Sequence, residues 1–227
     1  MVFLGNTDNL ATQQDQRSPV PGIAGTIPTP GTRNSVPEIA TVYQSDRAIT
    51  RSFRVVTDFQ NVSTAELTSP NPADWTYWRR TPYSQGFTPL DQISKENVTN
   101  LSLAWVWGME SGRSQPAPLV KNGIIFIPNF GNVVQALDGS DGTLLWEYRR
   151  QFPDGGRRGG HLRTLAMWED MIYVATTDAH LVALDARTGA VRWDVEIADE
   201  TKGYSNTSGP IVADGKVING ITGCTRF

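Results

Sequence analysis

The sequence predicts an all-β fold, and three observations support this. Short runs rich in β-branched residues recur along the chain and are bounded by Gly, Asp and Asn, as strands separated by turns usually are. A convincing amphipathic helix is absent, and only residues 90–101 have a pattern that allows one or two helical turns. All seven Trp residues lie between Trp75 and Trp193, where they are expected to be structural. The clearest strand candidates are residues 123–127, 171–174 and 216–218.

Residues 1–70 differ in composition from the rest and predict an extended arm. They are rich in Pro, Thr, Ser, Gln and Asn, and their apolar stretches, such as residues 52–56, are short. Such a segment buries too little apolar area to offset the entropy lost on ordering, so we expect it to be partly disordered. Part of it is expected to pack on the body that follows. The Pro-Asn-Pro stretch at residues 70–72 marks the boundary, which leaves residues 71–227 for the folded body.

The strongest signal in this body is an internal repeat with a period of 47 residues. The stretch VVQALDGSDGTLLWEY around Asp138 matches LVALDARTGAVRWDV around Asp185, with the Ala, Leu, Asp, Gly and Trp of both copies 47 positions apart. The same offset places residues 125–127 on residues 172–174, and a third copy begins near residue 210. A period of roughly 40–50 residues is typical of β-propeller blades, which have four short strands each. We therefore predict a partial β-propeller of about three blades.

Each residue type of the repeat suits a particular position in a blade. The Leu before the Asp ends a strand and is expected to point into the core. In the Asp-x-x-x-Gly turn, Gly142 and Gly189 can adopt a positive φ without the penalty that a side chain would bring. The Trp that follows offers a large flat surface to the adjacent blade. We expect Trp146 and Trp193 to occupy equivalent structural positions.

Charge and composition exclude several functions. The net charge of −3 argues against a nucleic-acid-binding domain, because such domains usually have a strong basic bias. No apolar run approaches the length of about 18 residues that indicates a transmembrane helix. A single cysteine, Cys224, excludes an internal disulfide and a zinc site of several cysteines. The N-terminus lacks the basic and apolar regions of a secretory leader, so no signal peptide is predicted.

The repeat resembles the tryptophan-docking motif of quinoprotein alcohol dehydrogenases, the enzymes that depend on pyrroloquinoline quinone (PQQ). The opening stretch DWTYWRRTPYSQGFTPLDQISKENVTNLSLAWVW is similar to the start of their propellers, with Trp105 as a degenerate first docking residue. The resemblance covers residues 73–227. The residues that match the Ala-x-Asp-x-x-Thr-Gly-x-x-x-Trp pattern are Ala183, Asp185, Thr188, Gly189 and Trp193.

Propellers of this family have eight blades, so the resemblance implies that this chain is the N-terminal part of a larger enzyme. An open stack would also expose an unpaired strand edge and an apolar blade face. The resemblance implies a periplasmic oxidoreductase that oxidises an alcohol or a similar CH–OH group, with PQQ accepting a hydride and an acceptor such as a cytochrome c downstream. The catalytic base is expected from a later blade, and this chain alone is expected to be inactive.

The resemblance also implies cofactor-binding residues. Arg163 matches an arginine that lies against the quinone and carboxylate oxygens, and a guanidinium suits such planar, bidentate recognition. Thr207 and Thr222 match hydroxyl donors to the carboxylates, and Gly223 and Cys224 would offer backbone amides at the same rim. The alternatives are a solvated surface position for Arg163 and ordinary strand and turn positions for the others.

Three features depart from the family pattern. Gln115 stands where many relatives carry a glutamate near the cofactor, and its amide can act as a donor there. Residues 155–160 are Gly-rich where many relatives have a vicinal Cys-Cys disulfide; they either approach the flat ring closely or form a flexible loop. Thr225 lies where relatives carry a glutamate ligand for calcium. Because hard cations prefer carboxylate oxygen, the implied calcium site is expected to be weakened or built differently.

The remaining charged groups are expected to be solvated or structural. His161 and His180 lie on different repeat elements and predict no metal pair. Arg149, Arg150 and the acidic run that begins at Asp194 are expected at solvated blade rims.

A function of another class is the alternative: a non-catalytic propeller with the same repeat that scaffolds an outer-membrane or polymer-binding assembly. Such a scaffold has no reason to keep Arg163, Thr207 and Thr222 together near the propeller axis.

Overall fold

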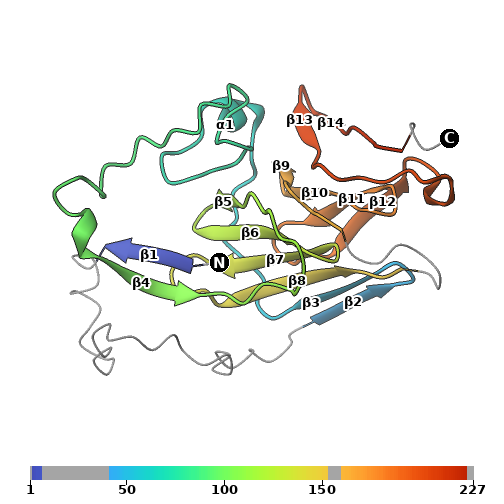
Figure 1. Cartoon of the computed structure of the whole chain (residues 1–227), viewed down its shortest axis with the longest axis horizontal. Helices are drawn as coiled ribbons and strands as arrows, with labels where there is room; N and C mark the ends of the chain where they lie inside the picture. The colour runs from blue at the N-terminus through green and yellow to red at the C-terminus, as the bar shows by residue number, and fades with distance from the viewer. Residues whose placement is uncertain (1, 7–40, 153–159, 224–227) are drawn as a thin grey trace.

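The structure is a computed structural model that describes residues 2–6, 41–152 and 160–223 of the chain (Figure 1). Strands dominate these residues, which confirms the predicted all-β class. Within these ranges the helical elements are the short helix α1 (Thr64–Thr68) and two single 3-10 turns, Val98–Asn100 and Glu200–Lys202. None of the helices in these ranges is long and apolar enough to cross a membrane.

The first blade is formed by β5 (Leu119–Lys121), β6 (Ile124–Asn129), β7 (Val133–Asp138) and β8 (Leu144–Arg150). Two strands from the predicted arm, β2 (Thr41–Ser45) and β3 (Ala48–Ser52), extend this blade. β3 pairs antiparallel with β8, which gives a six-stranded sheet in the order β2-β3-β8-β7-β6-β5. Part of the arm is therefore integral to the propeller, while residues 7–40 lie outside the described ranges.

The second blade consists of β9 (Ala166–Trp168), β10 (Met171–Ala175), β11 (His180–Asp185) and β12 (Val191–Glu196). It is an antiparallel sheet in the order β12-β11-β10-β9. A third unit begins with the hairpin of β13 (Ile211–Ala213) and β14 (Lys216–Ile218). At the other end of the chain, β1 (Val2–Asn6) pairs with β4 (Leu101–Val106).

The two complete blades have the same register. Ala136 lies opposite Trp146 in the first blade, as Ala183 lies opposite Trp193 in the second. In each blade the pairing shifts by one position directly after this Ala. The repeat in the sequence therefore corresponds to a repeat in pairing, which confirms the predicted blade architecture and the equivalence of the two Trp positions.

Trp105 and Trp146 each contact the Asp-x-x-x-Gly turn of the blade that follows. Trp146 Nε1 donates to the carbonyl of Ala186 at 3.0 Å, and a Cβ on Gly189 would lie 2.5 Å from the Trp146 ring. Trp105 Nε1 donates in the same way to the carbonyl of Gly139 at 3.1 Å. Gly189 has a φ of +72°, as the turn requires. The tryptophans therefore join consecutive blades, and Trp105 on β4 acts as the first of them.

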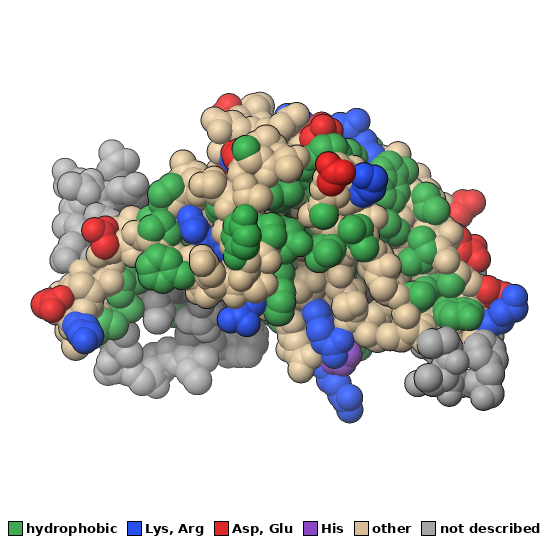
Figure 2. All heavy atoms as spheres, turned by 90° about the horizontal axis from the view of Figure 1, so that it is seen from above, with side chains coloured by type: hydrophobic (Ala, Val, Ile, Leu, Met, Phe, Trp, Pro, Cys, Tyr) green, Lys and Arg blue, Asp and Glu red, His purple; other side chains and the backbone are tan. Residues whose placement is uncertain are grey.

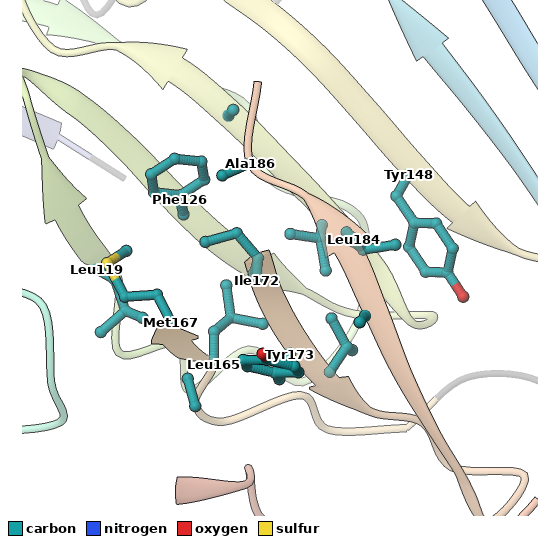
Figure 3. Packing of buried hydrophobic residues seen from close by; sticks show 14 of the residues in the cluster. Leu119, Phe126, Tyr148, Leu165, Met167, Ile172, Tyr173, Leu184 and Ala186 are labelled. Carbon is teal, nitrogen blue, oxygen red and sulfur yellow. The ribbon is translucent and has the colours of Figure 1, made fainter. Parts of the chain in front are cut away.

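The hydrophobic core lies between the first and second blades. Phe126 and Tyr148 from the first blade and Ile172 and Leu184 from the second are fully buried in one cluster (Figure 3). The ring centroids of Phe126 and Trp146 are 5.9 Å apart. Since a blade buries its faces only against its neighbours, this cluster fixes how the two sheets stack.

Apolar side chains are not confined to this core. Viewed from above, hydrophobic side chains cover a broad band of the surface (Figure 2). Ile211 on β13 and Ile218 on β14 are among the exposed ones. The hairpin that begins the third unit therefore exposes apolar surface that a complete blade would cover.

Helix α1 was not predicted from the sequence. Its N-terminus is a capping box: the Ser63 hydroxyl accepts from the backbone N–H of Glu66, and the Glu66 carboxylate accepts from the backbone N–H of Ser63. The helical pattern at residues 90–101 yields only the 3-10 turn Val98–Asn100.

Candidate functional site

The first strands of successive blades bring three predicted site residues to one end of the stack. Gln115 precedes β5, Arg163 precedes β9 and Thr207 precedes β13. Ala117 and Thr164 form a parallel bridge, in which the Ala117 N–H donates to the carbonyl of Arg163 at 2.7 Å. Because the first strands of neighbouring blades run in the same direction, the residues before them lie at the same end.

Arg163 links the other two residues directly. Its Nε donates to Gln115 Oε1 at 3.2 Å, and its Nη1 donates to the backbone carbonyl of Thr207. The Arg163 side chain is half-buried, while Gln115 is exposed. One guanidinium therefore spans three blades and holds their loops at a fixed separation, which a solvated surface arginine would not do.

Thr222 lies at the same end, because it is bridged to the segment that carries Thr207. Thr222 and Ser205 form an antiparallel bridge with two backbone hydrogen bonds of 3.0 Å, and Thr222 Oγ1 donates to the Ser205 carbonyl at 2.7 Å. Gly223 has a φ of +132°, and a Cβ there would lie 2.7 Å from the carbonyl oxygen of Gly203. Glycine is therefore required at this close approach of two loops. The predicted residue Cys224, with Thr225 and residues 153–159, lies outside the described ranges.

Two buried residues that sequence reasoning missed support the Thr207 loop. Ser205 Oγ donates to the carbonyl of Thr177 at 2.8 Å. Asn206 Nδ2 donates to the carbonyls of Thr176 at 2.9 Å and His180 at 3.2 Å. The only signal in the sequence was the polar run before the β13 strand. These bonds anchor the loop to the β10–β11 turn of the preceding blade.

Arg150 is not at a solvated rim, and that prediction was wrong. Its side chain is fully buried, and its Nε and Nη2 donate to Asp178 Oδ2 at 2.9 and 2.7 Å. Its Nη1 donates to Asp194, whose other oxygen lies 2.6 Å from His180 Nδ1. Two carboxylates of the second blade therefore compensate one cation of the first. The cluster is connected to the Thr207 loop, because Asn206 donates to the carbonyl of His180.

The surroundings of this cluster shift the pKa of two of its groups. Burial opposes ionisation of Asp194, but the hydrogen bonds from His180 and Arg150 outweigh it and hold the pKa of this carboxyl below its ordinary value. Burial raises the pKa of the neighbouring Tyr148 phenol. Asp194 therefore remains an anion against Arg150.

The donor groups at this end suit a planar polycarboxylate. Arg163 supplies a guanidinium, Gln115 an amide, and Thr207 and Thr222 hydroxyl groups, around loops that approach each other closely. In addition, His161 Nδ1, two positions from Arg163, is buried and makes no hydrogen bond within the described part of the chain. The residues present fit PQQ. In those same ranges no three His, Cys, Asp or Glu side chains are grouped to hold a metal ion.

Comparisons with known proteins point in the same direction. The family described as PQQ, glucose/ethanol/alcohol dehydrogenase, beta-propeller domain, matches residues 75–224. The dehydrogenase subunit of alcohol dehydrogenase (quinone) from Gluconobacter oxydans (strain 621H) is 35% identical over 175 residues, which are 71% of this chain and 23% of that protein. Quinohemoprotein alcohol dehydrogenase ADH-IIG from Pseudomonas putida is 38% identical over 156 residues, which are 66% of this chain and 22% of that protein.

A solved structure is similar as well. The structure of quinohemoprotein alcohol dehydrogenase ADHIIG from Pseudomonas putida HK5 has a TM-score of 0.63 and 32% identity, and the match covers 74% of this chain and 26% of that one. The chain thus spans less than a quarter of the length of the two curated relatives.

Proposed function

Since the chain belongs to the PQQ glucose/ethanol/alcohol dehydrogenase β-propeller family, we propose that it forms the first blades of a dehydrogenase that oxidises an alcohol or a similar CH–OH group with PQQ. The observation that carries this proposal is the contact of Arg163 with both Gln115 and the Thr207 carbonyl. A scaffolding propeller needs the docking tryptophans, but it has no use for a guanidinium that spans three blades at one end.

We propose that Gln115, Arg163, Thr207, Thr222, Gly223 and Cys224 line part of the cofactor site. When bound, PQQ supplies the group that accepts the hydride. Arg163 would bind its carboxylate and quinone oxygens as a planar donor, and Gln115 would hold the orientation of the guanidinium. Thr207 would donate from the neighbouring loop, which Asn206 anchors. Thr222 would donate as well once its hydroxyl turns away from the Ser205 carbonyl, to which it donates in this structure.

Four further parts of the proposal rest on the resemblance alone. The enzyme would act in the periplasm and pass electrons to an acceptor such as a cytochrome c. Calcium would be the accompanying metal, although Thr225 stands where a carboxylate ligand is expected. The catalytic base would come from a later blade.

The test is equilibrium binding of PQQ to the 227-residue chain, with quenching of Trp fluorescence as the readout. Replacing Arg163 by Gln should weaken binding about tenfold or more, because a hydrogen bond to a charged group contributes about 1.5–3 kcal/mol. Arg51→Gln, which removes a partly exposed guanidinium paired with Glu147 on the first blade, is the matched control and should bind like the wild type. Equal affinity of the two variants would contradict the role of Arg163.

A further inference from the structure

A cavity lies next to helix α1, in the segment that follows this helix. None of its lining residues belongs to the proposed Arg163 site. It has a volume of about 560 Å³, is open to solvent, and is lined by residues from the end of α1 and from the loop at residues 80–89. The family resemblance assigns no role to it. The residues that line it are Thr68, Ser69, Pro70, Pro72, Arg80, Thr81, Tyr83, Gln85 and Pro89.

Arg80 is held in this cavity by its backbone and by one end of its guanidinium. Its N–H donates to the carbonyl of Tyr77 at 2.8 Å, and its φ is +77°, which is uncommon for a residue with a side chain. Its Nη2 donates to the carbonyl of Pro70 at 3.3 Å. Its Nε, however, is buried and makes no hydrogen bond within the described residues.

Thr81, which also lines this cavity, has a second unsatisfied group. The residue is only 7% exposed, and its Oγ1 is buried without a hydrogen-bond partner in the described ranges. Leaving a buried polar group unsatisfied costs about 1–3 kcal/mol, and more when the group is charged. Two such groups on adjacent residues, lining one cavity, indicate a missing partner that accepts hydrogen bonds.

The charge of the cavity points to the nature of that partner. None of the lining residues is acidic, and Arg80 forms no ion pair with any described residue. The neighbouring Arg79 differs: it is exposed, stacks over the Trp78 ring at 5.8 Å and lines another, apolar cleft. Unlike Arg79, Arg80 therefore has a guanidinium that is partly removed from water and has no anion beside it among the described residues.

We propose that Arg80 and Thr81 form a binding site for a carboxylate or phosphate group. The Arg80 Nε–H and the Thr81 hydroxyl would donate to oxygens of the anion, and the guanidinium would balance its charge. The site is independent of the proposed PQQ site, because it shares no residue with it.

The test is a titration of the ¹⁵N-labelled chain with sodium phosphate or sodium acetate. Sodium chloride at equal ionic strength is the control. Binding is followed in ¹H–¹⁵N spectra that resolve arginine Nε–H signals. The Arg80 Nε–H and the Thr81 amide should shift to saturation with phosphate, acetate or both. Saturation by one anion alone distinguishes a phosphate site from a carboxylate site. Shifts that match those in chloride would overturn the proposal.

Variants localise the site. Arg80→Gln and Thr81→Val should each raise the half-saturating concentration about tenfold, since each removes one donor to a charged group. Arg79→Gln is the matched control and should leave it unchanged. Thr81→Val preserves the shape of the side chain, so it keeps the test valid if Arg80→Gln unfolds. Undiminished binding in both cavity variants, or equal loss in Arg79→Gln, would contradict the assignment.

Discussion

Arg150 reaches from the end of β8 to Asp178 and Asp194 in the next blade, with its side chain shielded from water. The adjacent Arg149 points to the other face and pairs with Glu147 and Glu110. Strand geometry makes neighbouring side chains alternate between faces, so one of two consecutive arginines had to turn inward. The sequence does not say which, because the carboxylates that make burial tolerable are 28 and 44 positions away.

Removing one of these carboxylates should destabilise the stack. Asp178→Asn leaves the buried Arg150 with only Asp194, and breaking a buried ion pair costs about 3–5 kcal/mol. We expect a loss near the lower end of this range, because Asp194 remains and the amide can still accept a hydrogen bond. The measurement is urea unfolding followed by Trp fluorescence.

Asp214→Asn is the control for this variant. It breaks the exposed pair of Asp214 with Lys216 on the third hairpin and should change the unfolding midpoint little. If both variants lose the same stability, the buried cluster contributes no more than a surface pair.

At the scale of elements, the repeat in the sequence predicted the strands and further features. It also predicted the turn glycines and the docking tryptophans, because these positions are determined within one period of the chain. The addition of β2 and β3 to the first blade could not be found this way, since a strand in a polar arm is stabilised only by its partner β8. Arg163 and Thr207 were proposed from family resemblance. Ser205 and Asn206, which hold the loop, are marked in the sequence only by the polar run before β13, which does not indicate their partners in the preceding blade.

Gly189 is needed more for the close contact with the Trp146 ring than for the conformation of the turn. Gly189→Ala would strain a residue at φ +72° and place a Cβ 2.5 Å from the Trp146 ring. Gly131→Ala, at φ +79° with no atom within 4 Å of its Cβ, imposes the strain without the contact. The control should lose about 1 kcal/mol of unfolding free energy, as a left-handed conformation costs with a side chain. Gly189→Ala should lose about 2–4 kcal/mol, because the overpacking adds to this strain.

Thermal and urea unfolding of the two variants provide the measurement. If both variants lose a similar unfolding free energy, the Trp146 ring can move to accommodate the added methyl group. Docking of this Trp would then contribute little to the stability of the junction between blades.

At the scale of the whole molecule, the chain would provide one wall of the proposed cofactor site. It spans 23% and 22% of the two curated relatives compared above, and the described part of the site consists of loops from three consecutive blade units. A planar cofactor held against this wall alone would be open to water on its remaining sides. Electrostatic stabilisation depends on exclusion of water, so Arg163 would bind the cofactor here without the field that a closed site provides.

The 227-residue chain supplied with PQQ and calcium should therefore not oxidise alcohols at a measurable rate, even if it binds PQQ. General acid–base catalysis contributes about 10²–10⁴-fold, and the base is proposed to come from a later blade. A dye-reduction assay with primary alcohols, alongside the fluorescence binding measurement, separates the two properties. Binding without turnover is the expected result, and Arg163→Gln should reduce the binding. Sustained PQQ-dependent dye reduction that scales with chain concentration would contradict it, because a complete catalytic site would then lie within these residues.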